Sequence, residues 1–98
     1  MIQVQLPPQL RSLAHVSGVV QIDVPPPVTL GAILDVLEGR APVLRGTIRD
    51  PVSGRRRAFI RFFIGTNDYS HVAMDEPLPD EVANGTQPVR IIGAIAGG

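Results

Sequence analysis

The residues at the carboxyl end of the chain, Ala96, Gly97 and Gly98, have the types that could take part in group-transfer chemistry. Glycine has no Cβ, so two glycines in succession let the backbone lie in a narrow tunnel and bring a terminal carboxylate against a nucleotide phosphate. Once such a carboxylate is activated, its acyl carbon is open to a nucleophile. The other interpretation is that Gly-Gly is only a frayed end, and the dipeptide alone does not exclude it.

Composition limits the other chemistry that the chain can perform. The sequence has no cysteine, which excludes thiolate metal sites and cysteine nucleophiles, and its nine basic residues are all arginine, which excludes lysine Schiff bases. His15 and His71 have no metal-ligand spacing around them, so they are interpreted as surface histidines and no metal site is expected. Without a nucleophile, a metal cluster or a phosphate-binding loop, the sequence does not indicate an autonomous enzyme.

The charge pattern does not indicate a nucleic-acid or membrane partner. Nine basic and nine acidic residues give a net charge of zero. The run Arg55–Arg57 could contact phosphates, but a solvated loop is the simpler interpretation, and the pairs Asp75-Glu76 and Asp80-Glu81 are expected on the surface. No apolar run approaches the roughly 18 residues that span a bilayer, and the amino end lacks an export signal, so a cytoplasmic location is expected.

Two segments near the amino end alternate apolar and polar residues, which is typical of strands with one buried face. A loop through Pro7-Pro8 and Ser17-Gly18 separates them, so the second strand is expected to return beside the first. The apolar positions of the two strands are Ile2, Val4 and Leu6, followed by Val20, Ile22 and Val24.

The next segment has the pattern of an amphipathic helix. Thr29 is a good N-cap and Gly39 suits the C-terminal cap. A short second helical turn is expected from Val43 to Ile48, and residues 50–54 form a loop by their turn residues. The apolar residues at helical spacing are Leu30, Ile33, Leu34 and Leu37.

A third strand is predicted over residues 58–64, where Ala58, Ile60, Phe62 and Ile64 form the apolar face and Phe59, Arg61 and Phe63 form the other. Residues 65–84 read as irregular, with Val72 and Leu78 as anchors in the core. Asn84-Gly85 is a tight-turn signal before a last strand, Val89 to Ala94.

This order of elements predicts an α+β fold, the ubiquitin-like β-grasp. Its mixed sheet has four to five strands, with the terminal strands adjacent, and packs on one main helix. Residues 1–92 are expected to form the domain and residues 93–98 a flexible tail. Six extended residues reach at most about 20 Å, enough to enter another protein's active site.

Several segments together resemble the MoaD/ThiS family of ubiquitin-like sulfur carriers, particularly its longer members, which include the mycobacterial carrier for cysteine synthesis. The likeness covers almost the whole chain, and its most specific part is the carboxyl end. The segments are Val28–Leu30 with Leu34, Leu37 and Glu38, then Pro42–Arg45, Arg57–Ile64, Asn67-Asp68, Pro77-Leu78, Asn84-Gly85 and Val89–Gly98.

The resemblance implies that Gly98 is the covalent carrier and that Gly97 and Ala96 thread into partner enzymes. An adenylyltransferase of the MoeB/ThiF type would join Gly98 to AMP with its own ATP, and a sulfur donor would convert the adenylate into a thiocarboxylate. The acceptor would be held by a molybdopterin synthase large subunit, a thiazole synthase or a cysteine synthase. The chain itself would bind no cofactor and have no catalytic residue, although it could be the small subunit of a synthase.

A docking surface is expected on the domain, because a stable interface needs roughly 800 Å² per side, which a short tail cannot supply. Phe59, Phe63, Ile92 and Arg61 are the candidates, unless the segment 65–84 folds over them and makes them core. Two other functions stay open. One is a protein modifier joined to lysines through Gly98, and the other is a binding module or enzyme subunit whose tail is inert.

Overall fold

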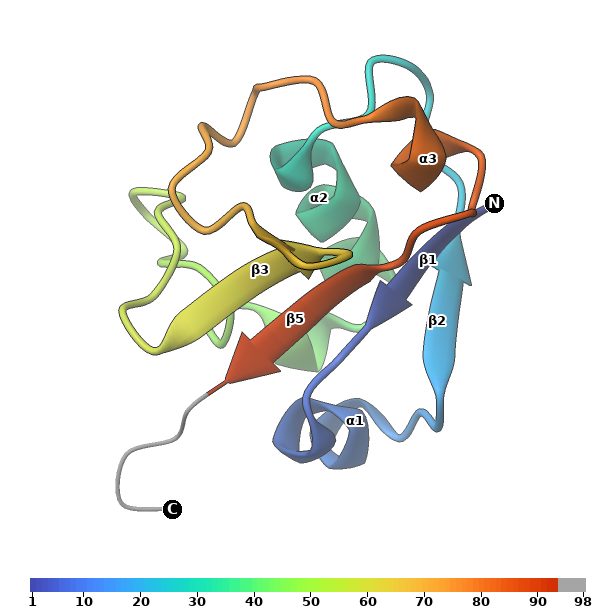
Figure 1. The fold of residues 1–98 in the computed structure, drawn as a ribbon. Coiled ribbons are helices and arrows are strands. Elements are labelled where there is room, and N and C mark those ends of the chain that lie inside the picture. The colour runs from blue at the N-terminus through green and yellow to red at the C-terminus, as the bar shows by residue number, and fades with distance from the viewer. Residues whose placement is uncertain (94–98) are drawn as a thin grey trace.

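The computed structural model describes residues 1–93 of the chain, and they form a mixed sheet of five strands in the order β2-β1-β5-β3-β4, backed by helix α2 (Figure 1). This is the β-grasp arrangement that the sequence predicts. The strands are β1 (Ile2–Gln5), β2 (Val19–Ile22), β3 (Ile60–Ile64), β4 (Asn67–Asp68) and β5 (Val89–Gly93), and the helices are α1 (Pro8–Ala14), α2 (Leu30–Arg40), the 3-10 helix η1 (Pro42–Leu44) and α3 (Asp80–Ala83).

The terminal strands lie side by side, as predicted. β1 pairs with β2 antiparallel along its whole length, and it pairs with β5 in parallel at Val4 with Val89 and at Gln5 with Arg90. The alternation of apolar residues sets this arrangement, because only one register places the apolar face of every strand towards the helix. Ile2 and Val4 are almost completely buried.

Helix α2 covers the inner face of the sheet. Thr29 caps it, since the threonine hydroxyl accepts a hydrogen bond of 3.0 Å from the backbone N–H of Ala32. The expected C-terminal cap at Gly39 is wrong, because the helix continues through Arg40 and ends at Ala41. The guanidinium of Arg40, the last residue of the helix, donates a hydrogen bond to the carbonyl of Gln21, which stabilises the longer helix. The buried residues are those at the predicted spacing, Leu30, Ile33, Leu34 and Leu37.

The sequence pattern does not predict helix α1, which lies between Pro7 and the loop expected around Ser17-Gly18. Proline at the first helical position lacks only an N–H that has no partner there, and its φ angle already suits a helix. Leu10 is the one fully buried residue of this helix, and a single buried residue cannot show the helical spacing by which a helix is recognised in a sequence. His15 ends it in a left-handed conformation, with φ of 57°.

Strand β3 is shorter than the predicted range of 58–64. Ala58 and Phe59 form a turn in which Ile60 donates its N–H to the carbonyl of Arg57, and both are exposed. Ala58 is therefore not part of the core. Ile60, Phe62 and Ile64 are buried as predicted, and β3 pairs with β5 from Ile60 with Gly93 to Ile64 with Val89.

The segment 65–84 contains β4 and α3 and is not irregular throughout. Each is short, and Val82 is the buried residue of α3, so periodicity does not reveal them. Leu78 is a core anchor as predicted and donates its N–H to Val28, whereas Val72 is only half-buried. The predicted turn at Asn84-Gly85 is present, and Gly85 has a φ of 80°.

The loop between η1 and β3 is held against α2 by Arg49, whose guanidinium bonds Glu38 at 3.0 Å and Asp35 at 2.5 Å. The predicted helical turn from Val43 to Ile48 is in fact the shorter η1, which starts at Pro42. Asp50 orders the loop tip, because its carboxylate accepts hydrogen bonds from the backbone N–H groups of Val52 and Ser53.

Within residues 1–93, no helix is long and apolar enough to cross a membrane.

Candidate functional site at the end of strand β5

Strand β5 lies in the middle of the sheet and runs towards the predicted tail. Gly93 is its last residue and pairs with Ile60, so the tail expected to begin at Gly93 does not include this residue. Beyond Arg90 the strand has no further residue pair with β1, because β1 ends at Gln5. The described end of β5 therefore has β3 on one side and a groove on the other.

The groove has a volume of about 290 Å³ and separates β5 from the start of α1. Pro7 and Pro8 form one wall, and Ile92 and Gly93 form the other. A methyl group on the Cα of Gly93 would make ordinary van der Waals contacts, at 3.4 Å from the Cδ1 of Ile60 and 3.6 Å from the Cγ of Pro7. Its complete lining is Gln5, Leu6, Pro7, Pro8, Gln9, Arg11, Arg90, Ile91, Ile92 and Gly93.

The predicted carrier residue Gly98 and the threading residues Gly97 and Ala96 lie outside the described residues, as does Ala94. Their roles stay predictions.

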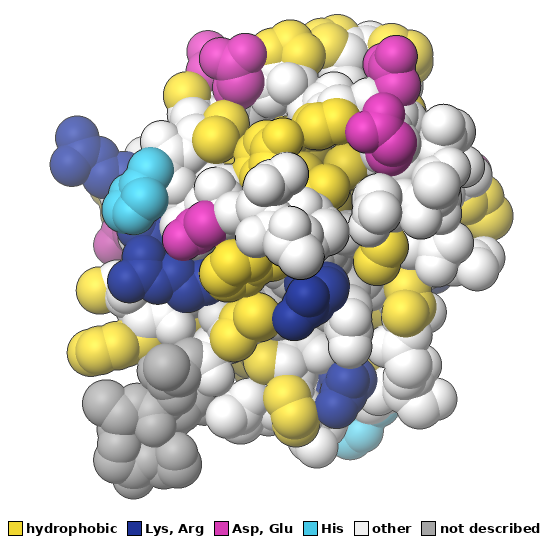
Figure 2. Space-filling view, in the orientation of Figure 1, with side chains coloured by type: hydrophobic (Ala, Val, Ile, Leu, Met, Phe, Trp, Pro, Cys, Tyr) yellow, Lys and Arg dark blue, Asp and Glu magenta, His cyan; other side chains and the backbone are white. Residues whose placement is uncertain are grey.

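The outer face of the sheet mixes apolar and basic side chains next to the end of β5. Arg61 lies opposite Ile92 in the register, and Phe63 lies opposite Arg90, so the two residue types alternate diagonally across β3 and β5. Arg61 and Arg90 are exposed, Ile92 is 37% exposed and Phe63 is half-buried. Figure 2 shows dark blue and yellow side chains together on this face.

Phe59 lies in the turn before β3 and is 61% exposed. The segment 65–84 thus leaves Phe59, Arg61 and Ile92 open to solvent, and it does not place them in the core.

Asp68 is the carboxylate next to this face, because β4 places it opposite Phe63. Hydrogen bonds from the side chain and the backbone N–H of Ser70 hold the pKa of Asp68 below its ordinary value, and the charge of Arg61 contributes less. Asp68 is therefore ionised at neutral pH, and it neutralises part of the charge of Arg61.

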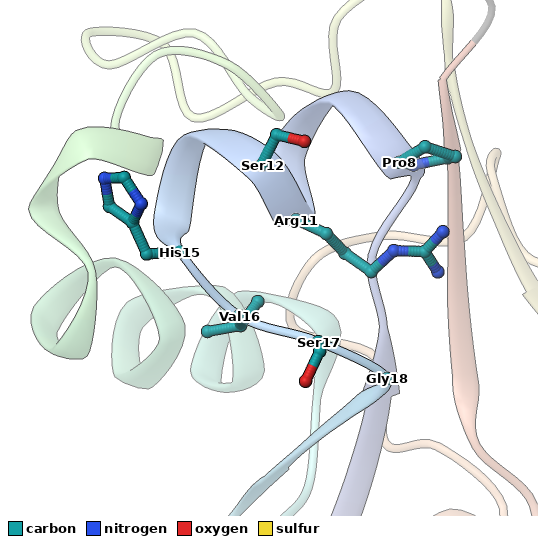
Figure 3. Close-up of a pocket in the computed structure, with 7 residues that line it drawn as sticks. All are labelled: Pro8, Arg11, Ser12, His15, Val16, Ser17 and Gly18. Atoms are coloured by element: carbon teal, nitrogen blue, oxygen red, sulfur yellow. The ribbon is translucent and has the colours of Figure 1, made fainter.

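Sequence reasoning missed Arg90 and Arg11. Arg90 could have been found, because it alternates with buried Val89 and Ile91 in the predicted last strand and so must face solvent. Arg11 had no such signal, since the helix that carries it was not predicted. Figure 3 shows the Arg11 side chain reaching away from α1 on the side of Pro8, and both residues line the groove.

A second, wide depression adjoins the groove along α1, since Pro8 and Arg11 line both (Figure 3). Ser12, His15 and Ser17 line it, but none of their side chains forms a hydrogen bond with another described residue. No group of three or more metal-ligating side chains occurs in residues 1–93.

No protein-family model matches the sequence, and no curated protein matches it either. Solved structures do match the fold. SAMP1 from Haloferax volcanii superposes with a TM-score of 0.74 at 22% identity, covering 98% of this chain and 97% of that chain. A second crystal structure, of H. volcanii small archaeal modifier protein 1, gives 0.72 at 19% identity, with 95% of each chain covered.

A chain from the crystal structure of the Amycolatopsis orientalis BexX/CysO complex superposes with a TM-score of 0.75 at 19% identity, and the match covers 100% of both chains. These likenesses confirm the ubiquitin-like β-grasp fold that the resemblance to the MoaD/ThiS family implies.

Proposed function

We propose that this β-grasp domain is a sulfur carrier that holds sulfur as a thiocarboxylate on Gly98. The carboxylate oxygen of Gly98 attacks the α-phosphate of ATP on a partner enzyme, and pyrophosphate leaves. Sulfide then attacks the acyl carbon of the adenylate, and AMP leaves with the oxygen that joined it to the carboxyl group. Adenylation is needed because a free carboxylate repels a nucleophile, whereas AMP is a good leaving group.

The observation that carries the proposal is the position of β5. This central strand runs out of the domain beside an open face of mixed apolar and basic residues, and Ala94-Ile95-Ala96-Gly97-Gly98 follows it directly in the sequence. The last three of these residues, Ala96, Gly97 and Gly98, have no bulky side chain, which suits passage through a narrow tunnel. The whole-length fold match to one chain of the BexX/CysO complex supports a domain of this size that works with a protein partner.

The proposed partners supply all of the catalysis. An adenylyltransferase of the MoeB/ThiF type binds ATP and activates Gly98, and a synthase takes the sulfur into molybdopterin, a thiazole or cysteine. The carrier binds no cofactor of its own, and it could serve as the small subunit of such a synthase. Phe59, Arg61, Phe63 and Ile92 form the docking face on the domain, while Ala96 and Gly97 enter the active site.

Intact-mass spectrometry tests this function. The purified chain is incubated with ATP, sulfide and a purified adenylyltransferase of the same organism. A gain of about 16 Da, the mass by which sulfur exceeds the oxygen that it replaces, is expected in the wild type. A variant that ends at Ala96 is the matched control and should gain nothing. No mass change in the wild type, with an enzyme that activates another carrier, would refute the proposal.

A protein modifier is the second candidate, and the match to small archaeal modifier protein 1 favours it. The same acyl adenylate would then react with a lysine amine of another protein, forming an amide bond as AMP leaves. Cells that express an epitope-tagged chain would show a ladder of higher-mass conjugates, which the variant ending at Ala96 would lack. A thiocarboxylate without a ladder would favour the carrier.

A further inference from the structure

The nine arginines divide into two groups by what their side chains contact. Four of them donate hydrogen bonds that hold the fold together. Arg40 bonds Gln21, Arg49 bonds Asp35 and Glu38, Arg56 bonds the carbonyls of Arg57, Ile60 and Ser70, and Arg57 bonds the carbonyl of Gly46. The other five have no side-chain hydrogen bond or salt bridge within residues 1–93. These are Arg11, Arg45, Arg55, Arg61 and Arg90.

Three of the five unpartnered arginines surround the end of β5. Arg11 comes from α1 and Arg90 from β5, and both line the groove beside Gly93. Arg61 lies opposite Ile92 on the adjoining strand. Asp68 offsets only Arg61, and no acidic residue lines the groove. The groove therefore presents two guanidinium groups without a carboxylate to neutralise them.

Four of the nine acidic residues lie together in a segment that does not line the groove. Asp75, Glu76, Asp80 and Glu81 belong to the segment before α3 and to α3 itself. Figure 2 shows acidic side chains along the upper edge, over that segment and α3 in Figure 1, and basic side chains at the left and in the lower half, with an acidic side chain among those at the left. A chain of zero net charge thus has local polarity, because Arg11 and Arg90 line the groove beside Gly93 and these four carboxylates belong to another segment. Such polarity orients a protein as it approaches a charged partner.

The groove also determines which groups recognise a partner. Pro7 and Pro8 have no backbone N–H, so this wall offers no main-chain donors. The side-chain donors of the groove are the guanidinium forks of Arg11 and Arg90 and the amides of Gln5 and Gln9. A guanidinium fork matches a carboxylate with two parallel hydrogen bonds. A volume of about 290 Å³ accommodates a few side chains and not a domain. Its narrow apolar walls offer no aromatic ring on which a nucleic-acid base would stack.

We infer that this groove binds an acidic loop of the adenylyltransferase, at the rim of the active site that receives the tail. The inference rests on the proposed function and adds the chemistry of the partner surface. Because Gly93 lines the groove, a loop seated there lies beside the origin of the tail. Arg11 and Arg90 then position the domain so that the tail points into the active site.

The test compares two double charge reversals. Arg11→Glu with Arg90→Glu changes the groove, and Arg45→Glu with Arg55→Glu, in the loop before β3, makes the same change of net charge outside it. Affinity for the purified adenylyltransferase of the same organism is measured by calorimetry without ATP, and adenylation by ATP–pyrophosphate exchange. Circular dichroism on heating verifies that both variants are folded.

The groove variant should bind at least about 10-fold more weakly and raise KM equally, since two charge-assisted contacts are lost, while kcat at saturation changes less than about 2-fold. Its affinity should also lose most of the salt dependence of the wild type. The loop variant should stay within about 3-fold of the wild type.

If the groove variant and the loop variant weakened affinity for the adenylyltransferase equally, the inference would be overturned and the proposed function would stand. Wild-type binding that depends on the groove but yields no exchange would refute the proposed function alone, and an absence of any binding would refute both. If a fluorescent single-stranded DNA bound the wild type and this binding were lost in the groove variant, with enzyme affinity unchanged, the groove would be a nucleic-acid site instead.

Discussion

The turn at Gly85, which precedes β5, lies against the start of β1, and replacing this glycine with alanine should destabilise the domain in two ways. The φ of 80° is a conformation that costs an L-residue about 1–2 kcal/mol. In addition, the new methyl carbon would lie 2.5 Å from the backbone carbonyl oxygen of Met1, a separation that real Cβ atoms essentially never show. The chain before Ile2 must therefore move.

Gly18→Ala is the control that separates the conformational cost from the steric contact, because the φ of Gly18 is 68° and no atom lies within 4 Å of the position of its Cβ. Both Gly→Ala variants lose unfolded-state entropy, which offsets roughly 0.4–1 kcal/mol of the conformational cost. Gly18→Ala should thus lower the free energy of unfolding by about 1 kcal/mol or less. Gly85→Ala adds an overpacking cost of about 1–3 kcal/mol. It also strains the 3.0 Å hydrogen bond from Gln3 Nε2 to the Gly85 carbonyl.

Urea denaturation followed by circular dichroism measures both free energies, with equal m-values as the sign of an unchanged two-state transition. The expected difference between the two variants is about 1–3 kcal/mol. In Gly85→Ala, the amides of Ile2 and Gln3 should also exchange with solvent faster. Free energies that agree within about 0.5 kcal/mol would show that the amino end yields without cost, and the reasoning from the 2.5 Å contact would be refuted.

Three further predictions concern charge and exposure. Arg49→Met leaves the largely buried carboxylate of Glu38 without its partner and should lower the free energy of unfolding by roughly 1.5–3 kcal/mol in urea, whereas Arg55→Met should change it by less than about 0.5 kcal/mol. The N–H groups of Ser53 and Val52 lower the pKa of Asp50 below its ordinary value of 3.8, so the stability from these hydrogen bonds is complete above pH 3.8 and is lost as the pH falls through the lower pKa of the folded state. The NMR shifts of the two amides should therefore titrate at that lower pKa, and a midpoint above 3.8 would contradict the assignment. Phe59→Ser should leave the urea midpoint unchanged, because this ring is 61% exposed, yet raise the KM of adenylation, and an unchanged KM would remove Phe59 from the docking face.

Elements whose apolar residues repeat at a regular spacing could be predicted from the sequence. β1, β2, β5 and α2 follow from apolar spacing and from the cap at Thr29, which are local properties of the chain. α1 and α3 could not, because each buries one residue, Leu10 or Val82, and one residue defines no period. The extent of β3 also depended on a remote segment, since its first pair, Ile60 with Gly93, is set by β5.

In the candidate site, too, some features could be predicted from the sequence and others depended on the tertiary structure. The sequence alone predicts Gly98 as the covalent carrier, with Gly97 and Ala96 as the threading residues, and these roles stay predictions. It also determined which side chains of a strand share a face, because this follows from a period of two. Only the tertiary structure decided which arginines are free to bind a partner. A guanidinium is occupied or available according to the carbonyls and carboxylates that distant segments bring to it. Packing of α1 beside β5 therefore created the groove of Arg11 and Arg90, which are far apart in the chain.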